Sequence, residues 1–442
     1  MGLRILCKSH FVKYNILSCI VCPVFFLSCN SNKPIVDANF TDSLLTHYAL
    51  PASFKAAETD ITFWKNGINP ASTGLVNESK YATALVARFH RSGDIRDVLS
   101  ADSMLNLVNA AYNEKEASPN ISLAAYSVLQ HRFPAADNYL EKAHKAGLKK
   151  YESLTASFDV DFEIGRYTNA AIYIKQLQPY KDYGYYFRKS KLDHLNGNMD
   201  SSIKAMLKAA ALAESSVYLK TVALSNAADL YIHNNELEKA NDLYMRCIRM
   251  NAADFHSITG LGWIALVHDK NDSLARQLFE FVHSQNKLPD PLFKLYQMAQ
   301  QKKDRALEFR YANDFASQAT DALYGNMYNK YLIEIYTGIL NEPAKAEIIA
   351  AAELNNRSTP QTNAWYAWAL FKNNKKEDAY QVYERAVSGK PLEGLELYWM
   401  GKMMQGLGRG YNAQQFFKAA WKNRYDLSPA MTTDLANILE SF

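Results

Sequence analysis

The stretch GKMMQGLGRGYNA, residues 401–413, places four glycines within ten residues, beside a lysine and an arginine. Loops of this kind hold phosphate when they follow a strand and open a helix, or when they end in Gly-Lys-Ser/Thr. Here the preceding LELYWMGKMMQ has the pattern of a helix, and no Gly-Lys-Ser/Thr occurs. We therefore predict a contact between helices at Gly401, a turn at Gly408 and a new helix around Ala413, which leaves Gly406 and Gly410 without a role.

Histidine, cysteine and carboxylate side chains, which form most metal and catalytic sites, show no functional spacing in this chain. The ten histidines form no HExxH motif and no close cluster with cysteine, and Gly-x-Ser-x-Gly is absent. Asp159 and Asp161 are two positions apart, which places them on opposite sides of a helix. We predict a protein without enzymatic activity, metal or cofactor.

The charge balance argues against nucleic-acid binding. The net charge is +4, but Arg4, Lys8 and Lys13 all precede residue 29, where no acidic residue occurs. The rest of the chain has 49 − 3 = 46 basic residues against 45 acidic ones and no sustained Lys/Arg stripe. No basic field remains that would attract a polyanion.

The N-terminus has the features of a secretory signal. A basic segment is followed by ILSCIVCPVFFLS (16–28), an apolar run that is short for a membrane span. The run ends with Ser28 before Cys29, and FLSC resembles the lipobox of bacterial lipoproteins, in which the cysteine is acylated. Cys19 and Cys22 are weaker candidates, and an ordinary cleaved signal remains an alternative. Removal of residues 1–28 leaves Cys29 and Cys247, so an acylated Cys29 excludes an intramolecular disulfide.

A triplet of small, large and small residues at positions i, i+4 and i+7 recurs along the chain, most clearly at Ala379/Tyr383/Ala386 and Ala413/Phe417/Ala420. First members also occur at 136, 170, 202, 240, 275 and 344, so that the steps are 34, 32, 38, 35, 69, 35 and 34 residues. This spacing is one face of a helix. A second small residue lies about twelve positions earlier, and turn residues separate the two at Gly165, Gly197, Asn235, Asn374 and Gly408.

These units resemble the tetratricopeptide (TPR) family, which implies an all-α superhelical solenoid of about 8–10 helical hairpins. We expect a signal peptide at 1–28, a tether with a helical segment at 29–78, the solenoid at 79–429 and a capping helix at 430–442. The tether is predicted to be extended over residues 30–50, and Trp64 is predicted to dock on the first repeat. The sixth triplet, within 305–319, cannot be placed from the sequence.

The resemblance also implies a concave groove lined by the first helix of each hairpin. Counting back from the triplets predicts these groove residues: Trp368, Phe371, Tyr398, Lys402, Gln405, Tyr336, Asn329, Asn326, Asp229, Ser225, Lys191, His194 and Phe187. Trp368 and Phe371 could instead pack against the next repeat. Aromatic, amide and lysine side chains suit an extended peptide or a glycan.

The resemblances together indicate a TPR lipoprotein of the Bacteroidota type, held by Cys29 in the outer membrane of a Gram-negative bacterium. Its expected role is a non-enzymatic scaffold that binds an envelope protein or peptide in the groove. The alternative is a glycan-binding accessory lipoprotein of a polysaccharide uptake system.

Overall fold

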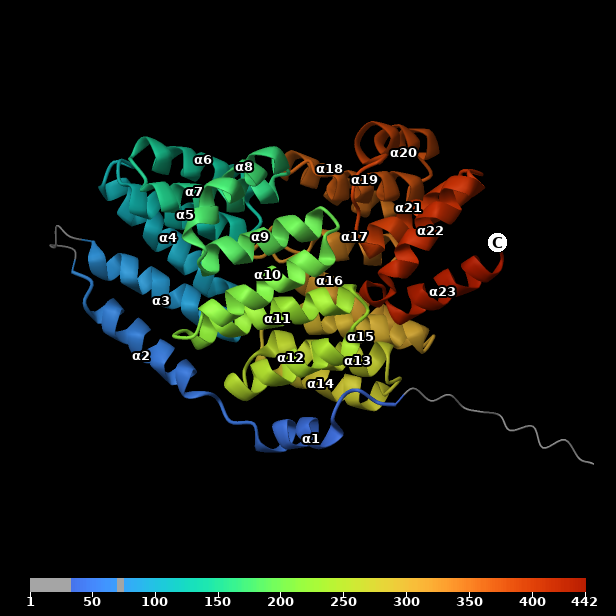
Figure 1. Cartoon of the computed structure of the whole chain (residues 1–442), viewed down its shortest axis with the longest axis horizontal. Helices are drawn as coiled ribbons and strands as arrows, with labels where there is room; N and C mark the ends of the chain where they lie inside the picture. Colours follow the sequence, from blue (N-terminus) through green and yellow to red (C-terminus); the bar gives the residue numbers. More distant parts are fainter. Residues whose placement is uncertain (1–32, 70–74) are drawn as a thin grey trace, which may run out of the picture. The chain divides into compact units, whose positions relative to one another are not determined.

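The structure is a computed structural model that describes residues 33–69 and 75–442, and this part of the chain contains 23 α-helices and no strand. Helices α3 to α22 form ten successive hairpins, and all of these helices belong to one unit, Pro34–Phe442 (Figure 1). The hairpins are α3 (Val76–Ser92) with α4 (Ile95–Ala111), α5 (Ala117–Leu129) with α6 (Phe133–Lys145), α7 (Lys150–Glu163) with α8 (Tyr167–Leu177), α9 (Tyr183–Leu195) with α10 (Met199–Leu212), α11 (Val217–His233) with α12 (Leu237–Met250), α13 (Phe255–Val267) with α14 (Asp272–Gln285), α15 (Asp290–Gln301) with α16 (Arg305–Ala319), α17 (Asn329–Thr337) with α18 (Pro343–Asn356), α19 (Pro360–Lys372) with α20 (Lys376–Val382), and α21 (Gly394–Gly406) with α22 (Gly410–Lys422). This confirms the predicted all-α solenoid of TPR-like hairpins.

Each hairpin turns at one residue with left-handed backbone. These residues are Gly93, His131, Gly165, Gly197, Asn235, Lys270, Lys303, Asn341, Asn374 and Gly408, with φ between 51° and 86°. A left-handed residue ends the first helix and lets the chain reverse within a short turn. The turns at Gly165, Gly197, Asn235, Asn374 and Gly408 are therefore confirmed.

The second helix of each hairpin buries the predicted triplet face in most repeats. The first members Ala136, Ala170, Ser202, Ala240, Ala275, Ala379 and Ala413 are all fully buried. The triplet Ala344/Ile348/Ala351 is wrong, because Ala344 is exposed and the Ile348 side chain is 70% exposed. The buried face of α18 is instead Ala346, Ala350 and Glu353.

The missing sixth triplet lies on α16, where Glu308, Ala312 and Phe315 are buried. Glu308 takes the place of the small residue and is paired with Arg305 at 3.3 Å. A charged residue at this position explains why the pattern is hidden in the sequence.

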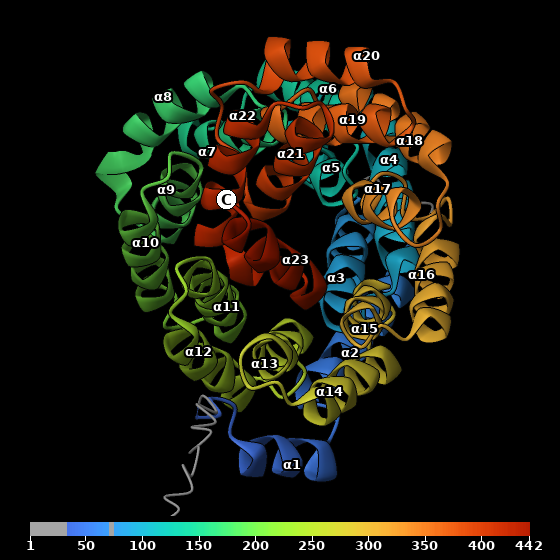
Figure 2. The same cartoon turned by 90° about the vertical axis from the view of Figure 1, so that its right-hand side faces the viewer.

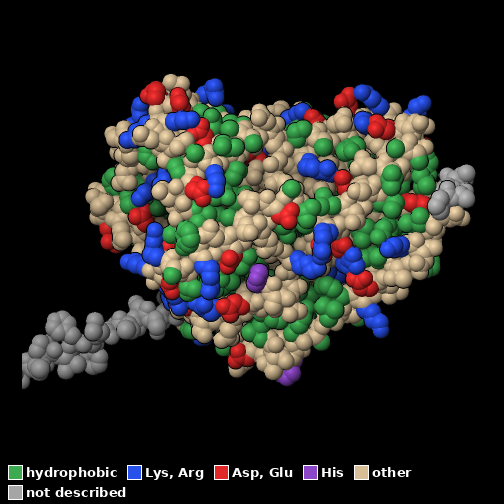
Figure 3. Space-filling model, turned by 180° about the vertical axis from the view of Figure 1, so that it is seen from behind, with side chains coloured by type: hydrophobic (Ala, Val, Ile, Leu, Met, Phe, Trp, Pro, Cys, Tyr) green, Lys and Arg blue, Asp and Glu red, His purple; other side chains and the backbone are tan. Residues whose placement is uncertain are grey.

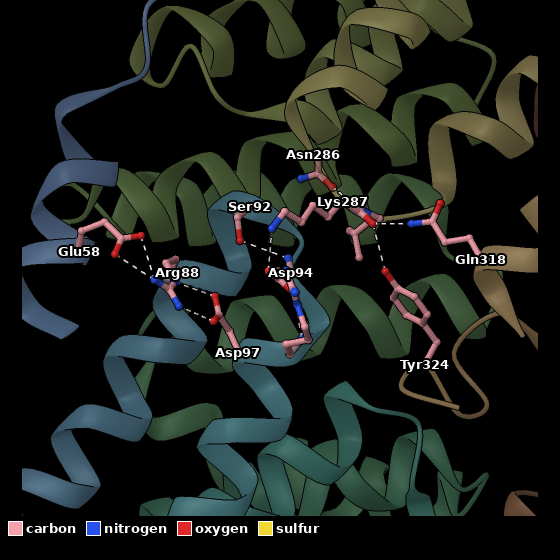
Figure 4. A network of polar contacts seen from close by, with 11 residues as sticks. Glu58, Arg88, Ser92, Asp94, Asp97, Asn286, Lys287, Gln318 and Tyr324 are labelled. Carbon is pink, nitrogen blue, oxygen red and sulfur yellow. Dashed lines mark hydrogen bonds and ion pairs between the residues drawn. The ribbon is translucent and has the colours of Figure 1, made fainter. Parts of the chain in front are cut away.

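The hairpins wind into a superhelix whose successive turns touch (Figure 2). The Lys287 N–H donates to the Ser92 carbonyl at 2.9 Å, and its Nζ pairs with Asp94 at 2.8 Å (Figure 4). Asn356 donates to the His131 carbonyl at 2.9 Å, and Asn235 donates to the Lys422 carbonyl at 2.8 Å. These contacts join residues 193, 225 and 187 positions apart, so one superhelical turn takes about six hairpins.

The segments on either side of the hairpins also pack on the superhelix. Helix α2 (Ala52–Asn66) lies on α3, with Trp64 against the apolar cluster of the first hairpin as predicted. At the other end, α23 (Pro429–Glu440) packs on α22 and also on α15, so it lies inside the curve of the hairpins (Figure 2).

The predicted extended tether is wrong for residues 38–47, because these form helix α1 (Ala38–His47). Asp37 caps the helix, and the apolar residues Phe40, Leu44 and Tyr48 pack against the main core. No helix in residues 33–69 and 75–442 is both long and apolar enough to span a bilayer. The predicted signal peptide and Cys29 lie outside the described residues.

Candidate functional site

Two cavities lie inside the superhelix, where the first helices of the hairpins face one another. Cavity 1, of about 750 Å³, is lined mainly by α9, α19 and the segment just before α21, and cavity 2, of about 1130 Å³, mainly by α11, α13, α15 and α17. Both are lined by His233, Lys330, Glu393 and Asp426. Their size is that of a ligand pocket.

Ion pairs across cavity 2 connect neighbouring first helices. Asp229 on α11 accepts from the Tyr244 hydroxyl at 2.5 Å and pairs with His256 on α13 at 2.9 Å. The Asp229 carboxylate raises the pKa of His256 to about 9. The histidine is therefore protonated near neutral pH, and Asp229 is held in place as part of a charged pair.

The wall between the cavities is supplied partly by the C-terminal segment. His233 on α11 pairs at 2.7 Å with Asp426, in the short helix η3 (Arg424–Asp426). Burial opposes the charge of His233, but Asp426 outweighs burial and raises its pKa to about 9. The Trp263 indole donates to the Tyr425 carbonyl at 2.8 Å, which fixes the same segment to α13.

Lys294 on α15 and Glu334 on α17 both line cavity 2, and neither forms an ion pair with another described residue. The Lys294 ammonium lies 3.7 Å from the centre of the Trp263 ring, and its hydrogen bond to Gln297 is 3.4 Å long. Burial lowers the pKa of Lys294 to about 8. Burial raises the pKa of Glu334 to about 7, and its Oε1 has no hydrogen-bond partner.

Lys330 lies beside Lys294 and Glu334, and its charge is neutralised by Glu393 and Glu396. Its ammonium is 3.0 Å from Glu396 and 3.8 Å from Glu393. Glu396 is fully buried and accepts a hydrogen bond from the Trp365 indole at 2.7 Å, while its Oε2 has no partner. Cavity 2 therefore presents the Lys294 ammonium, which has no carboxylate partner, and the unpartnered Oε1 of Glu334, whereas Glu396 belongs to the lining of cavity 1.

Cavity 1 is lined by a charged cluster and by amides. Glu163 pairs with Lys191 at 2.9 Å and with Arg357 at 3.4 Å. Amide side chains line the remaining wall, namely Asn196, Asn234, Asn235, Asn423 and Gln361. The side-chain oxygens of Asn235 and Gln361 are buried without a partner.

Four of the thirteen predicted groove residues line these cavities, and Ser225 is one of them, in cavity 2. Lys191 and His194 lie in cavity 1, and Asp229 lies in cavity 2. The counting from the triplets is therefore in phase with the concave face on α9 and α11.

The other nine predicted groove residues lie elsewhere. Trp368 is buried, stacks on Trp399 with 5.6 Å between the ring centroids and donates to Thr337 at 3.0 Å. Tyr398 and Lys402 both bond Asp434 of α23, at 2.6 and 3.0 Å. The chain's own helices thus take the place that a partner would occupy.

The six remaining members of that group do not line a cavity either, and Phe187 among them stacks on Tyr183 with 5.6 Å between the ring centroids. Phe371 packs against Gly406, Asn329 bonds Glu353 at 2.7 Å, Tyr336 is buried and Gln405 is exposed. Asn326 lies in the loop before α17. On α17, cavity 2 is lined by Lys330, Tyr331 and Glu334. These residues lie on a different face of the helix from the predicted Asn329 and Tyr336.

Sequence reasoning missed Lys294, Lys330 and Glu334. The available signal was a single charge inside an apolar first helix, as in PLFKLYQMAQ and YLIEIYTGIL. A charged residue is rarely buried unless it is paired or functional. In the described part of the chain no group of three or more His, Cys, Asp and Glu side chains could hold a metal ion.

No protein-family model and no curated protein matches the sequence. Among solved structures, a TPR protein from Parabacteroides merdae is 12% identical, with a TM-score of 0.33, over 58% of this chain and 98% of that one. Yeast Tom70 is 11% identical, with a TM-score of 0.35, over 82% and 96%. The TPR domain of P58(IPK) is 9% identical, with a TM-score of 0.27, over 91% and 97%. Similarities this distant carry no information about a ligand, so the TPR-like fold is assigned from the hairpins themselves.

Proposed function

We propose that this protein is a lipoprotein of the cell envelope, acylated on Cys29, that acts as a non-enzymatic scaffold and binds an extended segment of a protein partner in cavity 2. The N-terminal basic and apolar segments and the Ser28-Cys29 junction support the anchor. Several acyl chains on one residue give stable membrane attachment. By the same resemblance, the membrane is the outer membrane of a Gram-negative bacterium.

The observation that carries the binding site is the pair Lys294 and Glu334. A half-buried ammonium without a carboxylate and a buried carboxylate oxygen without a donor are both costly unless a ligand supplies the missing partners. A peptide has both, because its carboxylate or carbonyl groups suit Lys294 and its N–H groups suit Glu334. The α23 and η3 segments also lie inside the superhelix, where they contact α15, α11 and α21, so cavity 2 fits an extended segment better than a folded domain.

A photo-crosslinking experiment tests the binding site. Tyr218 lines cavity 2 and is 49% exposed, whereas Tyr180 is 45% exposed and lines neither cavity. Each tyrosine is replaced by p-benzoylphenylalanine in cells. We expect the same partner to be captured from position 218 in repeated experiments and not from 180, and to be lost when Lys294→Met is added. Equal capture at both positions, or capture that Lys294→Met leaves unchanged, would reject the site.

The anchor is tested separately. Cys29→Ala should abolish labelling by a fatty-acid analogue and release the protein from membranes. Persistent labelling of the variant would reject acylation at this cysteine, while leaving the cavity proposal intact.

A glycan ligand is the second candidate, and the amides of cavity 1 favour it. Unpartnered amide oxygens beside Trp365 and Tyr167 offer both hydrogen-bond acceptors and aromatic surface for a sugar. Screening the purified protein on a glycan array tests this, with Gln361→Leu as the variant that should lose binding. A stoichiometric protein partner together with no sugar binding would exclude the alternative.

A further inference from the structure

Cavity 2 extends along the whole of α11. Nine residues of this helix line the cavity, from Val217 at its first position to His233 at its last. An α-helix rises 1.5 Å per residue, so the face that lines the cavity is about 24 Å long. An extended peptide advances about 3.3 Å per residue, so about seven residues of a ligand fit along this face.

The cavity is open to solvent at the N-terminal end of α11. Val217 and Tyr218 are 56% and 49% exposed. The Tyr218 ring lies 5.7 Å from the ring of His90, an exposed residue near the end of α3 that also lines the cavity. We name Val217, Tyr218 and His90 the mouth. The mouth offers aliphatic and aromatic surface to whatever enters the cavity.

At the C-terminal end of α11 the cavity ends in a wall of buried side chains. His233 pairs there with Asp426 at 2.7 Å, and the Asp426 side chain is only 13% exposed. The residues Leu395 and Ser428, which line the cavity, are buried as well. A segment that lies along α11 therefore has to end at this wall. The cavity is suited to a chain terminus and not to a segment that passes through.

Lys294 and Glu334, the two cavity residues on which the proposed site depends, are not equally satisfied. The Lys294 ammonium lies 3.7 Å from the centre of the Trp263 ring and bonds Gln297 at 3.4 Å. The face of an indole ring stabilises such a cation. Oε1 of Glu334 has no partner, although Glu334 is only 4% exposed. The missing group is therefore a hydrogen-bond donor, and a positively charged donor forms the stronger bond with a carboxylate.

The charge of the lining also opposes a bound carboxylate. Six Asp and Glu side chains line cavity 2, against three Lys and Arg side chains. With His233 and His256 counted as protonated, one negative charge remains in excess. A ligand carboxylate would have to approach Glu334, and like charges brought together in an interface are unfavourable. On the outer face in Figure 3 acidic and basic side chains are interspersed, so that face shows no preference for one sign of charge.

We propose that cavity 2 binds the free amino-terminus of its partner chain, whose α-ammonium group pairs with Glu334. The carbonyl group of the first ligand residue accepts a hydrogen bond from Lys294. About seven residues further on, at the mouth, an apolar side chain of the ligand packs against Val217 and Tyr218. This inference rests on the proposed binding of an extended segment in cavity 2, and it adds which end of that segment enters and in which direction it lies.

The experiment measures how much of three pools of random heptapeptides the purified, immobilised full-length protein retains. The first pool has a free α-amino group and a fluorescent label at an amidated C-terminus. The second pool is identical but acetylated at the α-amino group, and the third has the label there and a free C-terminal carboxylate. We expect the first pool to be retained about tenfold more than the second, because acetylation removes a hydrogen bond to a charged group. Mass spectrometry of the retained peptides should show apolar residues enriched at the sixth or seventh position.

Three variants connect the retention to the residues of the cavity. Glu334→Gln should reduce retention of the first pool to that of the second. Glu308→Gln is the matched control, because Glu308 is also 4% exposed but lies on α16 and lines neither cavity. Tyr218→Ser should remove the preference for an apolar residue near the mouth, while the first pool keeps its advantage over the second. A thermal unfolding curve verifies that each variant is folded.

Several outcomes would overturn the inference. These are equal retention of the first and second pools, preferential retention of the third pool, and retention of none of them. Acetylated peptides held through a lysine side chain would place a side-chain ammonium at Glu334 and would overturn binding of the terminus. The photo-crosslinking from Tyr218 tests separately whether cavity 2 binds a partner at all. The proposed function can therefore stand when the amino-terminus inference fails.

Discussion

Gly401 tests the hairpin packing on which the fold rests. A Cβ added at Gly401 would lie 2.6 Å from Cδ1 and Cε1 of the Phe417 ring, which is fully buried. Carbon atoms in ordinary contact are about 3.5–4.0 Å apart, so the ring must move by about 1 Å. Overpacking of this kind costs about 1–3 kcal/mol, and the better helix propensity of alanine returns up to about 1 kcal/mol. We expect Gly401→Ala to lower the free energy of unfolding by about 1 kcal/mol.

Gly410 provides a matched control, because it is the first residue of the partner helix α22 and an added Cβ there has no atom within 4 Å. Gly410→Ala should be neutral or should stabilise by up to about 1 kcal/mol. Urea unfolding followed by circular dichroism measures both variants. Adding Phe417→Leu to Gly401→Ala should restore part of the lost free energy of unfolding, because it removes the ring atoms that the new Cβ would contact. If Gly401→Ala proves as stable as Gly410→Ala, the assigned contact between α21 and α22 is refuted.

Three other predictions concern burial and charge. Ala379 is fully buried, so Ala379→Phe should destabilise by about 1–3 kcal/mol in the same urea assay, and an unchanged midpoint would contradict the register. Arg357→Ala leaves the buried Glu353 without its cation, 2.8 Å away, and should cost about 3 kcal/mol. Removing the exposed Arg96 should cost far less, because solvent screens its pair with Asp94, and equal costs would contradict this. The pKa of Glu334 is raised from 4.5 to about 7 in the folded protein, so the folded state keeps this proton at a higher pH than the unfolded state does. The free energy of unfolding therefore falls as the pH rises from 4.5 to 7. Glu334→Gln should remove up to about 3 kcal/mol of that pH dependence, and parallel pH curves of variant and wild type would refute the assignment.

The hairpin architecture could be predicted from the sequence because it depends on local contacts. The residue at the turn and the triplet face about five residues later are set within one repeat, and Gly408 with Ala413 shows both. The prediction of a helix contact at Gly401 is confirmed. The structure also shows a role for Gly406, because a Cβ added there would lie 2.4 Å from Cζ of the Phe371 ring. Gly410 has no such neighbour.

The candidate site could be predicted only where the local repeat determines it. Lys191, His194 and Asp229 lie on first helices that face the superhelix interior, so counting within the repeat finds them. Tyr398 and Lys402 occupy equivalent positions, but α23 returns to cover them. That contact depends on how the chain closes on itself, which no pattern within one repeat encodes.

Closure of the superhelix also changes how its stability should be distributed. In an open solenoid each repeat contacts its neighbours only, so stability is nearly additive along the chain. Here Asn356 fastens α18 to the turn at His131, and Asp426 fastens the C-terminus to His233. The wall of cavity 2 includes Tyr425 and Asp426, so the cavity is complete only while the C-terminal segment remains joined to α11 and α13. The binding site is therefore a property of the closed superhelix, and a fragment of the repeats would lose it even if each hairpin stayed folded.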